Sequence, residues 1–278
     1  MYIRVPLRSS GQSFRPLIMG VVNVTPDSFS DGGLHATTER ALTHAKHLIR
    51  EGADWLDIGG ESTRPGSTPV DTEEELSRIM PVVEDLVSLN VPLSVDTSKP
   101  EVMRAAIAGG VSMINDITAL RTPGAFEAVA GGKVALCLMH MQGDPRSMQI
   151  NPRYRNVVWE VKTFLLERVR MAVAAGISRD RLVIDPGFGF GKTYDHNIEL
   201  LRHLDEFCDL GVPLMVGLSR KSMLGKITGN DVNDRVHASI AAALLAAAKG
   251  ASLIRVHDVK PTRDALTVYN AVCGSSLP

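Results

Sequence analysis

The feature that most constrains the fold of this 278-residue chain is a regular alternation of short apolar runs and helical patterns. Eight runs rich in β-branched and other apolar residues occur at 17–24, 55–60, 92–97, 113–117, 134–140, 181–187, 213–219 and 253–259. Amphipathic helical patterns lie between them, for instance TTERALTHAKHLIREG and EEELSRIMPVVEDLVSL, and several end at a glycine. Strands that are apolar on both faces and separated by helices form parallel sheets. Eight such units in about 240 residues predict a single closed (β/α)8 barrel, with an open doubly wound sheet as the alternative.

Composition and length narrow the class of protein further. No linker, composition shift or low-complexity segment marks a second domain, so we expect one domain over residues 1–278. Lys and Arg total 30 against 31 Asp and Glu, so no overall positive charge attracts nucleic acid or a membrane surface. Three cysteines without CxxC spacing, and no signal-like apolar segment at the start, predict a cytoplasmic protein. The stretch SIAAALLAAA predicts a helix covered on both sides, by the sheet and by a second subunit of a homodimer.

Polar residues gather where the predicted strands end, which is where the active site of such a barrel is built. These strand-end residues are Asn23, Asp57, Asp96, Asn115, Asp116, His140, Asp185, Ser219, Arg220, Lys221, Arg255 and His257, together with Glu61 to Arg64. Buried carboxylates and amides are costly unless they pair or meet a ligand, so the set predicts an active site. For single residues such as Asp57 and Asp116, pairing with neighbouring groups remains an alternative.

The charges at these strand ends divide into two groups. One group is basic and suits an anion such as diphosphate: Arg64, Arg220, Lys221, Arg255 and His257. The other group, Asp96, Asn115 and Asp185, offers carboxylates and an amide to a flat heterocycle with several N–H donors. A substrate that carries both parts would fit the predicted mouth of the barrel.

Several local patterns suggest other functions. The stretch DPGFGFGKT lacks the glycine spacing of a phosphate-binding loop, so its glycines more plausibly let the backbone bend close to what Asp185 holds. His44 and His47 lie one helical turn apart but have no third metal ligand nearby in sequence. His140 is either catalytic or an ordinary polar strand end. Lys221 beside Arg220 leaves open a Schiff-base aldolase, because a neighbouring cation lowers the pKa of a lysine.

Seven segments together resemble one family, the bacterial dihydropteroate synthases of the pterin-binding barrel class. They are NVTPDSFSDGG, DIGGESTRPGS, SVDTSKP, INDIT, DPGFGFGKT, LSRKSMLG and RVHDV, in order from about residue 18 to 265. The resemblance implies a transferase (EC 2.5.1.15) of folate biosynthesis that is a sulfonamide target. It joins (7,8-dihydropterin-6-yl)methyl diphosphate to 4-aminobenzoate and releases diphosphate and 7,8-dihydropteroate. It also implies a Mg²⁺ requirement, a barrel fold and a homodimer.

The resemblance also assigns roles to single residues. It implies that the pterin ring is held by Asp96, Asn115, Asp185, Lys221 and Arg255. It implies that Phe29, Thr63, Pro65, Ser219 and Lys221 border the aminobenzoate, and that Thr63, Arg64, Arg255 and His257 bind the diphosphate. Asn23 would coordinate Mg²⁺. The catalytic set would be Asp96, Asp185, Lys221, Arg255 and Asp31, with the carboxylates stabilising a pterin-methyl cation.

The segment NVTPDSFSDGG, residues 23–33, is longer than a strand-to-helix connection requires. A pterin-methyl cation is quenched by water unless the mouth is covered, so we expect this segment to act as a lid that carries Phe29 and Asp31. Three alternatives remain at this stage. They are a pterin-dependent methyltransferase acting on a corrinoid protein, a Schiff-base aldolase using Lys221, and a non-catalytic pterin-binding homologue.

Overall fold

The computed structural model describes residues 5–7, 15–25, 33–62 and 66–273. Its strands are β1 (Leu17–Asn23), β2 (Trp55–Gly59), β3 (Leu93–Asp96), β4 (Met113–Asp116), β5 (Ala135–Met139), β6 (Leu182–Asp185), β7 (Met215–Val216) and β8 (Leu253–Val256). Its helices are α1 (Gly33–Arg50), α2 (Thr72–Leu86), α3 (Pro100–Ala108), α4 (Ala125–Ala130), α5 (Val157–Ala174), α6 (Tyr194–Arg202), α7 (Ser222–Thr228), α8 (Val236–Ala248) and α9 (Val259–Cys273).

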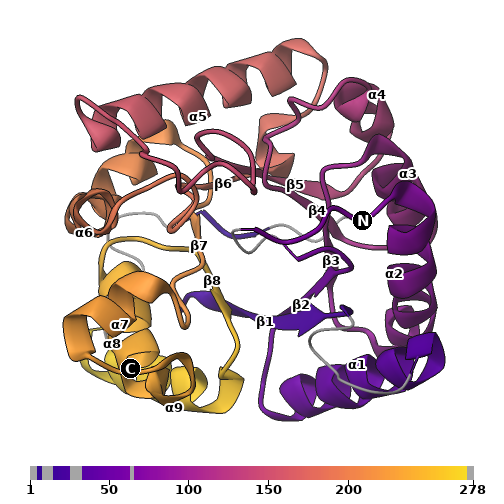
Figure 1. Ribbon diagram of the computed structural model, residues 1–278, viewed down its shortest axis with the longest axis horizontal. Helices are drawn as coiled ribbons and strands as arrows, with labels where there is room; N and C mark the ends of the chain where they lie inside the picture. Colours follow the sequence, from indigo (N-terminus) through magenta and orange to yellow (C-terminus); the bar gives the residue numbers. More distant parts are fainter. Residues whose placement is uncertain (1–4, 8–14, 26–32, 63–65, 274–278) are drawn as a thin grey trace.

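The strands form one parallel sheet in the order β6-β5-β4-β3-β2-β1-β8-β7. An isolated parallel bridge between Ile184 and Leu214 joins the two edges, and the Ile184 amide donates to the Pro213 carbonyl at 3.0 Å. The helices surround this ring of strands (Figure 1). The predicted (β/α)8 barrel is therefore confirmed.

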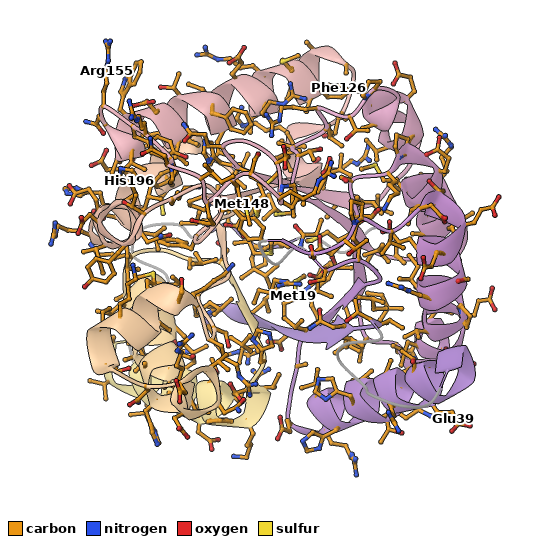
Figure 2. The ribbon with its side chains drawn as sticks, viewed as in Figure 1. Met19, Glu39, Phe126, Met148, Arg155 and His196 are labelled. Carbon is orange, nitrogen blue, oxygen red and sulfur yellow. The ribbon has the colours of Figure 1, made fainter. Side chains whose placement is uncertain are left out.

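Side chains along each strand alternate between the barrel interior and the helical layer, because the side-chain period of a strand is two. Inside the barrel, Met19, Trp55, Met113 and Leu253 form a cluster with Val5 from the start of the chain. Met19 lies within the ring of strands, whereas Glu39 of α1 lies at the outer rim (Figure 2). These side chains fill the barrel, so its interior is a packed core and not a pore. Burying each large apolar side chain contributes roughly 1.5–3 kcal/mol to the stability of the fold.

The seventh expected run is the one that the structure shortens most. Of residues 213–219 only Met215 and Val216 form a ladder. The backbone then turns, with the Lys221 amide donating to the Leu218 carbonyl at 3.3 Å and Arg220 at φ 59°. The polar segment Ser219 to Lys221 therefore leaves the sheet as a turn at the mouth of the barrel.

One outer face of the barrel carries exposed apolar side chains. Leu245 of α8 is 53% exposed, and Val268 and Val272 of α9 are 65% and 78% exposed. The helices α7, α8 and α9 that form this face lie together in the lower left of Figure 1. Within the described ranges, no helix is both long and apolar enough to cross a membrane.

Candidate active site

The carboxyl ends of the first four strands bring one layer of polar residues together. The ladder pairs Asn23 with Gly59, Gly59 with Asp96, and Asp96 with Asn115. Because neighbouring residues in a parallel ladder point to the same side, these side chains share the interior of the mouth. Gly59 adds no side chain, which leaves space between Asn23 and Asp96.

Arg255 is the centre of the mouth. Its Nε donates to Asp57 Oδ2 at 2.6 Å, and a terminal nitrogen donates to Asp96 Oδ2 at 3.2 Å. Asn115 Nδ2 donates to the same Asp57 oxygen at 3.2 Å. Asp57 is fully buried, whereas the Arg255 side chain is 23% exposed. The guanidinium therefore spans two carboxylates while part of it remains open to the mouth.

Two buried oxygens of this cluster have no hydrogen-bond partner in the described part of the chain. They are Asp57 Oδ1 and Asn115 Oδ1. Buried polar atoms are nearly always paired in folded proteins, so an unpaired acceptor calls for a ligand or water. Both oxygens are acceptors and would be satisfied by N–H donors.

The acidic groups at the mouth have displaced pKa values. Burial, together with the nearby charge of Asp57, raises the pKa of Asp96 to about 7. Burial also raises the pKa of Asp185, whose Oδ1 accepts from the Gly187 amide at 2.7 Å. Such displaced carboxyl groups are typical of sites that meet a ligand. Hydrogen-bond donors or cations that approach these groups would lower their pKa values again.

Lys221 lies on the other side of the mouth. Burial and the charge of Arg255 lower the pKa of its ammonium group to about 8. Its Nζ lies 4.3 Å from the centre of the Phe190 ring, a cation–π contact. The charges of Lys221 and Asp185 influence the pKa values of one another.

The basic arc predicted from the sequence is only partly free to bind an anion. Arg220 holds Asp258 with two hydrogen bonds, of 3.1 and 2.6 Å. His257 Nδ1 lies 3.0 Å from the Ser219 hydroxyl. Burial and Arg255 lower the pKa of His257 to about 3, so this imidazole is neutral and offers an N–H donor rather than a charge.

Five residues to which the resemblance assigns roles lie outside the described residues: Phe29, Asp31, Thr63, Arg64 and Pro65. The described residues on either side end at Thr25 and Ser62 and resume at Gly33 and Gly66. Their assigned roles therefore remain predictions.

Asn23 is the residue to which the resemblance assigns Mg²⁺. Its Oδ1 is a hard oxygen donor at the end of β1, beside the space left by Gly59. No group of three or more His, Cys, Asp or Glu side chains within the described ranges is arranged to hold a metal ion. Mg²⁺ is commonly bound by one or two protein oxygens plus substrate phosphates and water, and the Asn23 oxygen is of that kind.

Several other polar residues have structural partners. Asp116 accepts from the Thr118 and Leu120 amides, both at 2.7 Å, and so forms the turn after β4. His44 Nε2 lies 3.2 Å from the Val21 carbonyl, while His47 pairs with Glu51. The two histidines have different partners, which agrees with the interpretation that they are not a metal pair.

The Gly-rich segment after β6 packs tightly against the end of β5. Gly187 and Gly191 have φ values of 69° and 62°. A Cβ atom on Gly187 would overlap the His140 carbonyl oxygen, and one on Gly191 would overlap the Gln142 carbonyl oxygen. These glycines therefore serve close packing against the backbone after β5, whereas the sequence predicted a close approach to what Asp185 holds.

Two surface cavities of about 470 Å³ lie away from the mouth. One lies between α5 and α6, with Trp159 and His203 among its lining residues, and the other includes Lys46 of α1. None of the candidate site residues that the structure describes lines either cavity. The unpaired oxygens and displaced pKa values favour the mouth as the reactive site.

Asp57 and Lys192 differ in how far the sequence indicates their roles. Asp57 accepts hydrogen bonds from Arg255 and Asn115, which confirms the alternative that it pairs with neighbouring groups. Lys192 was not singled out, yet it is buried directly beneath the Gly-rich turn. A strand-end position was the available signal for Asp57, whereas no sequence signal marks a buried lysine.

Comparison with known proteins gives a consistent result. The family described as "Pterin binding enzyme" matches residues 19–257. A dihydropteroate synthase of Neisseria meningitidis serogroup C is 52% identical over 263 residues, covering 93% of each chain. The structure of a Xanthomonas albilineans dihydropteroate synthase with 4-aminobenzoic acid has a TM-score of 0.90 at 55% identity, covering 99% of this chain and 100% of that one. A structure of the Xanthomonas albilineans enzyme with 7,8-dihydropteroate has a TM-score of 0.86 at 54% identity, covering 96% of each chain.

Proposed function

Because this chain belongs to the family of pterin-binding enzymes and catalyses the dihydropteroate synthase reaction, we propose that the strand-end cluster around Arg255 is its active site. The reaction joins (7,8-dihydropterin-6-yl)methyl diphosphate to 4-aminobenzoate and releases diphosphate. The observation that carries the proposal is the pair of buried, unpaired acceptors, Asp57 Oδ1 and Asn115 Oδ1, beside Asp96.

The pterin ring lies among the acidic residues in this proposal. Its amino and ring N–H groups donate to Asp96, Asn115 and Asp185, and of these acceptors Asn115 Oδ1 has no partner among the described residues. Lys221 donates to a ring oxygen or nitrogen, and the exposed part of Arg255 stacks on the ring. The match between a donor-rich ring and an acceptor-rich wall supports this orientation.

The diphosphate lies toward β1 and β8. Arg255 and neutral His257 donate to its oxygens, together with Thr63 and Arg64. Mg²⁺, when bound at Asn23, would neutralise charge on the leaving diphosphate. Arg220 is not assigned a contact with the diphosphate, because its guanidinium is already bonded to Asp258.

The proposed chemistry begins with rupture of the bond between the pterin methylene carbon and the diphosphate oxygen, and the electron pair leaves with the oxygen. Asp96 and Asp185 stabilise the cation that remains, while Arg255 and His257 hold the departing diphosphate. The amine of 4-aminobenzoate then attacks the methylene carbon and loses a proton. Phe29, Thr63, Pro65, Ser219 and Lys221 border this amine, and the segment with Phe29 and Asp31 covers the cation against water.

The chain is also proposed to act as a homodimer of single-domain subunits in the cytoplasm. The exposed apolar side chains of α8 and α9 support a subunit contact on that face. Within the described residues no disulfide joins Cys137, Cys208 and Cys273, as is usual in a reducing compartment.

A coupled assay tests the function. Purified protein is mixed with the dihydropterin diphosphate and Mg²⁺, with and without 4-aminobenzoate, while diphosphate and dihydropteroate are measured. Equal amounts of both products, dependent on 4-aminobenzoate and lost with a chelator, are expected. Pterin binding without either product would contradict the proposal. Trapping of substrate on Lys221 by borohydride would instead indicate Schiff-base chemistry.

A further inference from the structure

Lys192 is a lysine whose side chain is only 2% exposed. It follows the Gly-rich turn and its side chain folds back beneath that turn. Its Nζ lies 2.9 Å from the Gly187 carbonyl oxygen, 2.9 Å from the Phe190 carbonyl oxygen and 2.9 Å from His140 Nδ1. No carboxylate among the described residues bonds to this Nζ. A buried cation without a bonded counterion is costly, so its retention requires an explanation.

A fourth acceptor, the His140 carbonyl oxygen, lies 3.4 Å from Nζ, so three carbonyl oxygens and one ring nitrogen surround the amine. Burial lowers the pKa of Lys192 well below its usual value, while the Asp185 carboxylate raises it. A neutral amine could donate to only two of the three oxygens, with its lone pair accepting from a proton on His140 Nδ1. A charged Lys192 instead requires a neutral His140 with its proton on Nε2, and burial together with the charge of Lys192 lowers the pKa of His140 to about 2. The hydrogen-bond geometry therefore favours a charged Lys192 beside a neutral imidazole.

The turn that Lys192 holds carries groups of the mouth. The Gly187 amide fixes Asp185 Oδ1 at 2.7 Å, and the Phe190 ring lies 4.3 Å from Lys221 Nζ. Lys192 bonds to the carbonyls of these same two turn residues. A shift of the turn would therefore move the donor to Asp185 and the ring beneath Lys221 together.

We propose that Lys192 is a positioning residue for the dihydropteroate synthase reaction, which ties the Gly187–Phe190 turn to His140 and so holds Asp185 and Lys221 in place for the pterin. The inference rests on the proposed assignment of Asp185 and Lys221 to the pterin. Lys192 itself does not touch the substrate. Its ammonium also supplies positive charge toward the Asp185 carboxylate.

The charges around Asp185 make the electrostatic effect of Lys192 on this carboxylate measurable. The cations that face it are Lys221, Lys192 and Arg255, and the thiol of Cys137 lies nearby. Loss of one cation raises the pKa of Asp185. Because Asp185 accepts N–H donors as a carboxylate, pterin binding is then lost at a higher pH than in the wild type.

The test compares Lys192→Met with Tyr154→Phe, using steady-state kinetics over a pH series. The control removes a hydrogen bond of 2.8 Å from Tyr154 Oη to the Gly191 carbonyl, in the same segment and without a change of charge. For Lys192→Met we expect the KM for dihydropterin diphosphate to rise by about tenfold or more, because buried acceptors lose their donor. The KM for 4-aminobenzoate changes little, and the acidic limb of the pterin kcat/KM profile moves to higher pH. In Tyr154→Phe that limb stays in place.

Three outcomes overturn the inference. They are an unchanged pterin KM in Lys192→Met, an unmoved acidic limb, or an equal loss in both KM values and kcat, which would indicate general structural damage. If Lys192→Met does not fold, as judged by circular dichroism, Lys192→Gln takes its place. The glutamine retains N–H donors but carries no charge, so the acidic limb of the pterin kcat/KM profile must still move. In wild-type protein, ¹⁵N NMR must show His140 as the neutral Nε2–H tautomer.

Asp185→Asn separates this inference from the proposed function. If it leaves the pterin KM unchanged, the assignment of Asp185 to the pterin fails. If Asp185→Asn weakens pterin use while Lys192→Met does not, only the role of Lys192 is overturned.

Discussion

Arg255 is the cation that links the carboxylates of Asp57 and Asp96 at the mouth of the barrel. Burial opposes its charge, but the neighbouring charges of Asp57 and Asp96 outweigh this effect and raise the pKa of its guanidinium. Removing Asp57, the fully buried partner, would cost several kcal/mol, whereas Arg255 keeps that partner when Asp96 is changed. Asp57, Asp96 and Arg255 therefore form one ion-pair network in the absence of substrate.

Asp96→Asn should impair turnover far more than folding. The carboxylate faces the ligand, and loss of charge stabilisation in a catalytic site commonly costs about 100-fold or more in kcat. Steady-state kinetics measure the loss, and thermal unfolding checks the fold. Wild-type turnover in this variant would remove Asp96 from the catalytic set.

The same variant should change how stability depends on pH. The pKa of Asp96 in the folded protein is raised from 3.8 to about 7, so between these values the folded state holds a proton that the unfolded state has lost. Wild-type stability therefore falls as pH rises through this window. We expect Tm of Asp96→Asn relative to wild type to be higher at pH 8 than at pH 4. A Tm difference that is independent of pH would show that Asp96 titrates normally.

Phe29→Ala should weaken use of 4-aminobenzoate selectively. Phe29 lies outside the described residues, so this prediction rests on the resemblance of the segment NVTPDSFSDGG. Loss of an aromatic wall should raise the KM for 4-aminobenzoate by about tenfold. Calorimetric titration with the dihydropterin diphosphate should give nearly the wild-type Kd, and an equal loss for both substrates would argue against a wall for one of them.

At the level of residues, the sequence identified those whose location at the end of a strand is enough to place them at the mouth of the barrel. Asp96, Asn115, Asp185 and Arg255 end strands, so a period of two sends them into the mouth. Asp57 belongs to the same strand-end set, and its bond to Arg255, 198 positions away in sequence, confirms the alternative that it pairs with a neighbouring group. The burial of Lys192 could not be predicted from the sequence, because it depends on a turn whose path only the packed structure defines.

Among the elements, β2, α2 and α3 are joined by one lysine. Lys99, just before α3, bonds to Glu61 after β2 and to Glu75 of α2, the latter at 2.5 Å. The Glu75 side chain is 1% exposed. This link fixes the end of β2 where it leads toward residues 63–65.

Lys99→Met should destabilise the protein strongly, by about 3–5 kcal/mol, because it leaves the buried Glu75 carboxylate unpaired. Lys162→Met is the matched control, since Lys162 pairs with Asp209, which is 73% exposed, and such surface pairs contribute about 1 kcal/mol or less. Urea unfolding measures both. Equal losses in the two variants would contradict the structural role of Lys99.

The boundaries of the elements follow from local signals only in part. The start of α2 is marked by Asp71, whose side chain accepts from the Glu74 amide at 2.8 Å, a common N-cap arrangement. The short length of β7 has no such signal. It depends on the turn that begins at Leu218, and hence on where Lys221 and Ser239 pack.

For the whole molecule, the eightfold alternation was sufficient to predict a closed barrel, because few architectures accommodate eight parallel strands with both faces buried. Closure itself depends on a single bridge between Ile184 and Leu214, which no local pattern reveals. The apolar stretch SIAAALLAAA predicted a helix with both sides covered, and the sheet accounts for one side.

A dimer through the other side is testable. Leu245→Glu combined with Val268→Glu should place unpaired charges in the contact and convert a species of twice 30.0 kDa into a monomer. Trp159→Glu on α5 is the control, because Trp159 is 64% exposed and α5 lies at the top of Figure 1, separated from α8 by α6 and α7. Sedimentation velocity measures the masses, and a dimer that survives the double change would place the contact elsewhere.

The tight turn at Gly187 and Gly191 also limits how this enzyme can evolve. Any side chain at either position would meet the backbone of the neighbouring strand end, and both φ values disfavour residues other than glycine. Single mutations therefore have little scope to reshape this wall of the pocket. Selection for altered ligand use would have to act on other segments, and an inhibitor resting against this turn would face a surface that is difficult to escape by mutation.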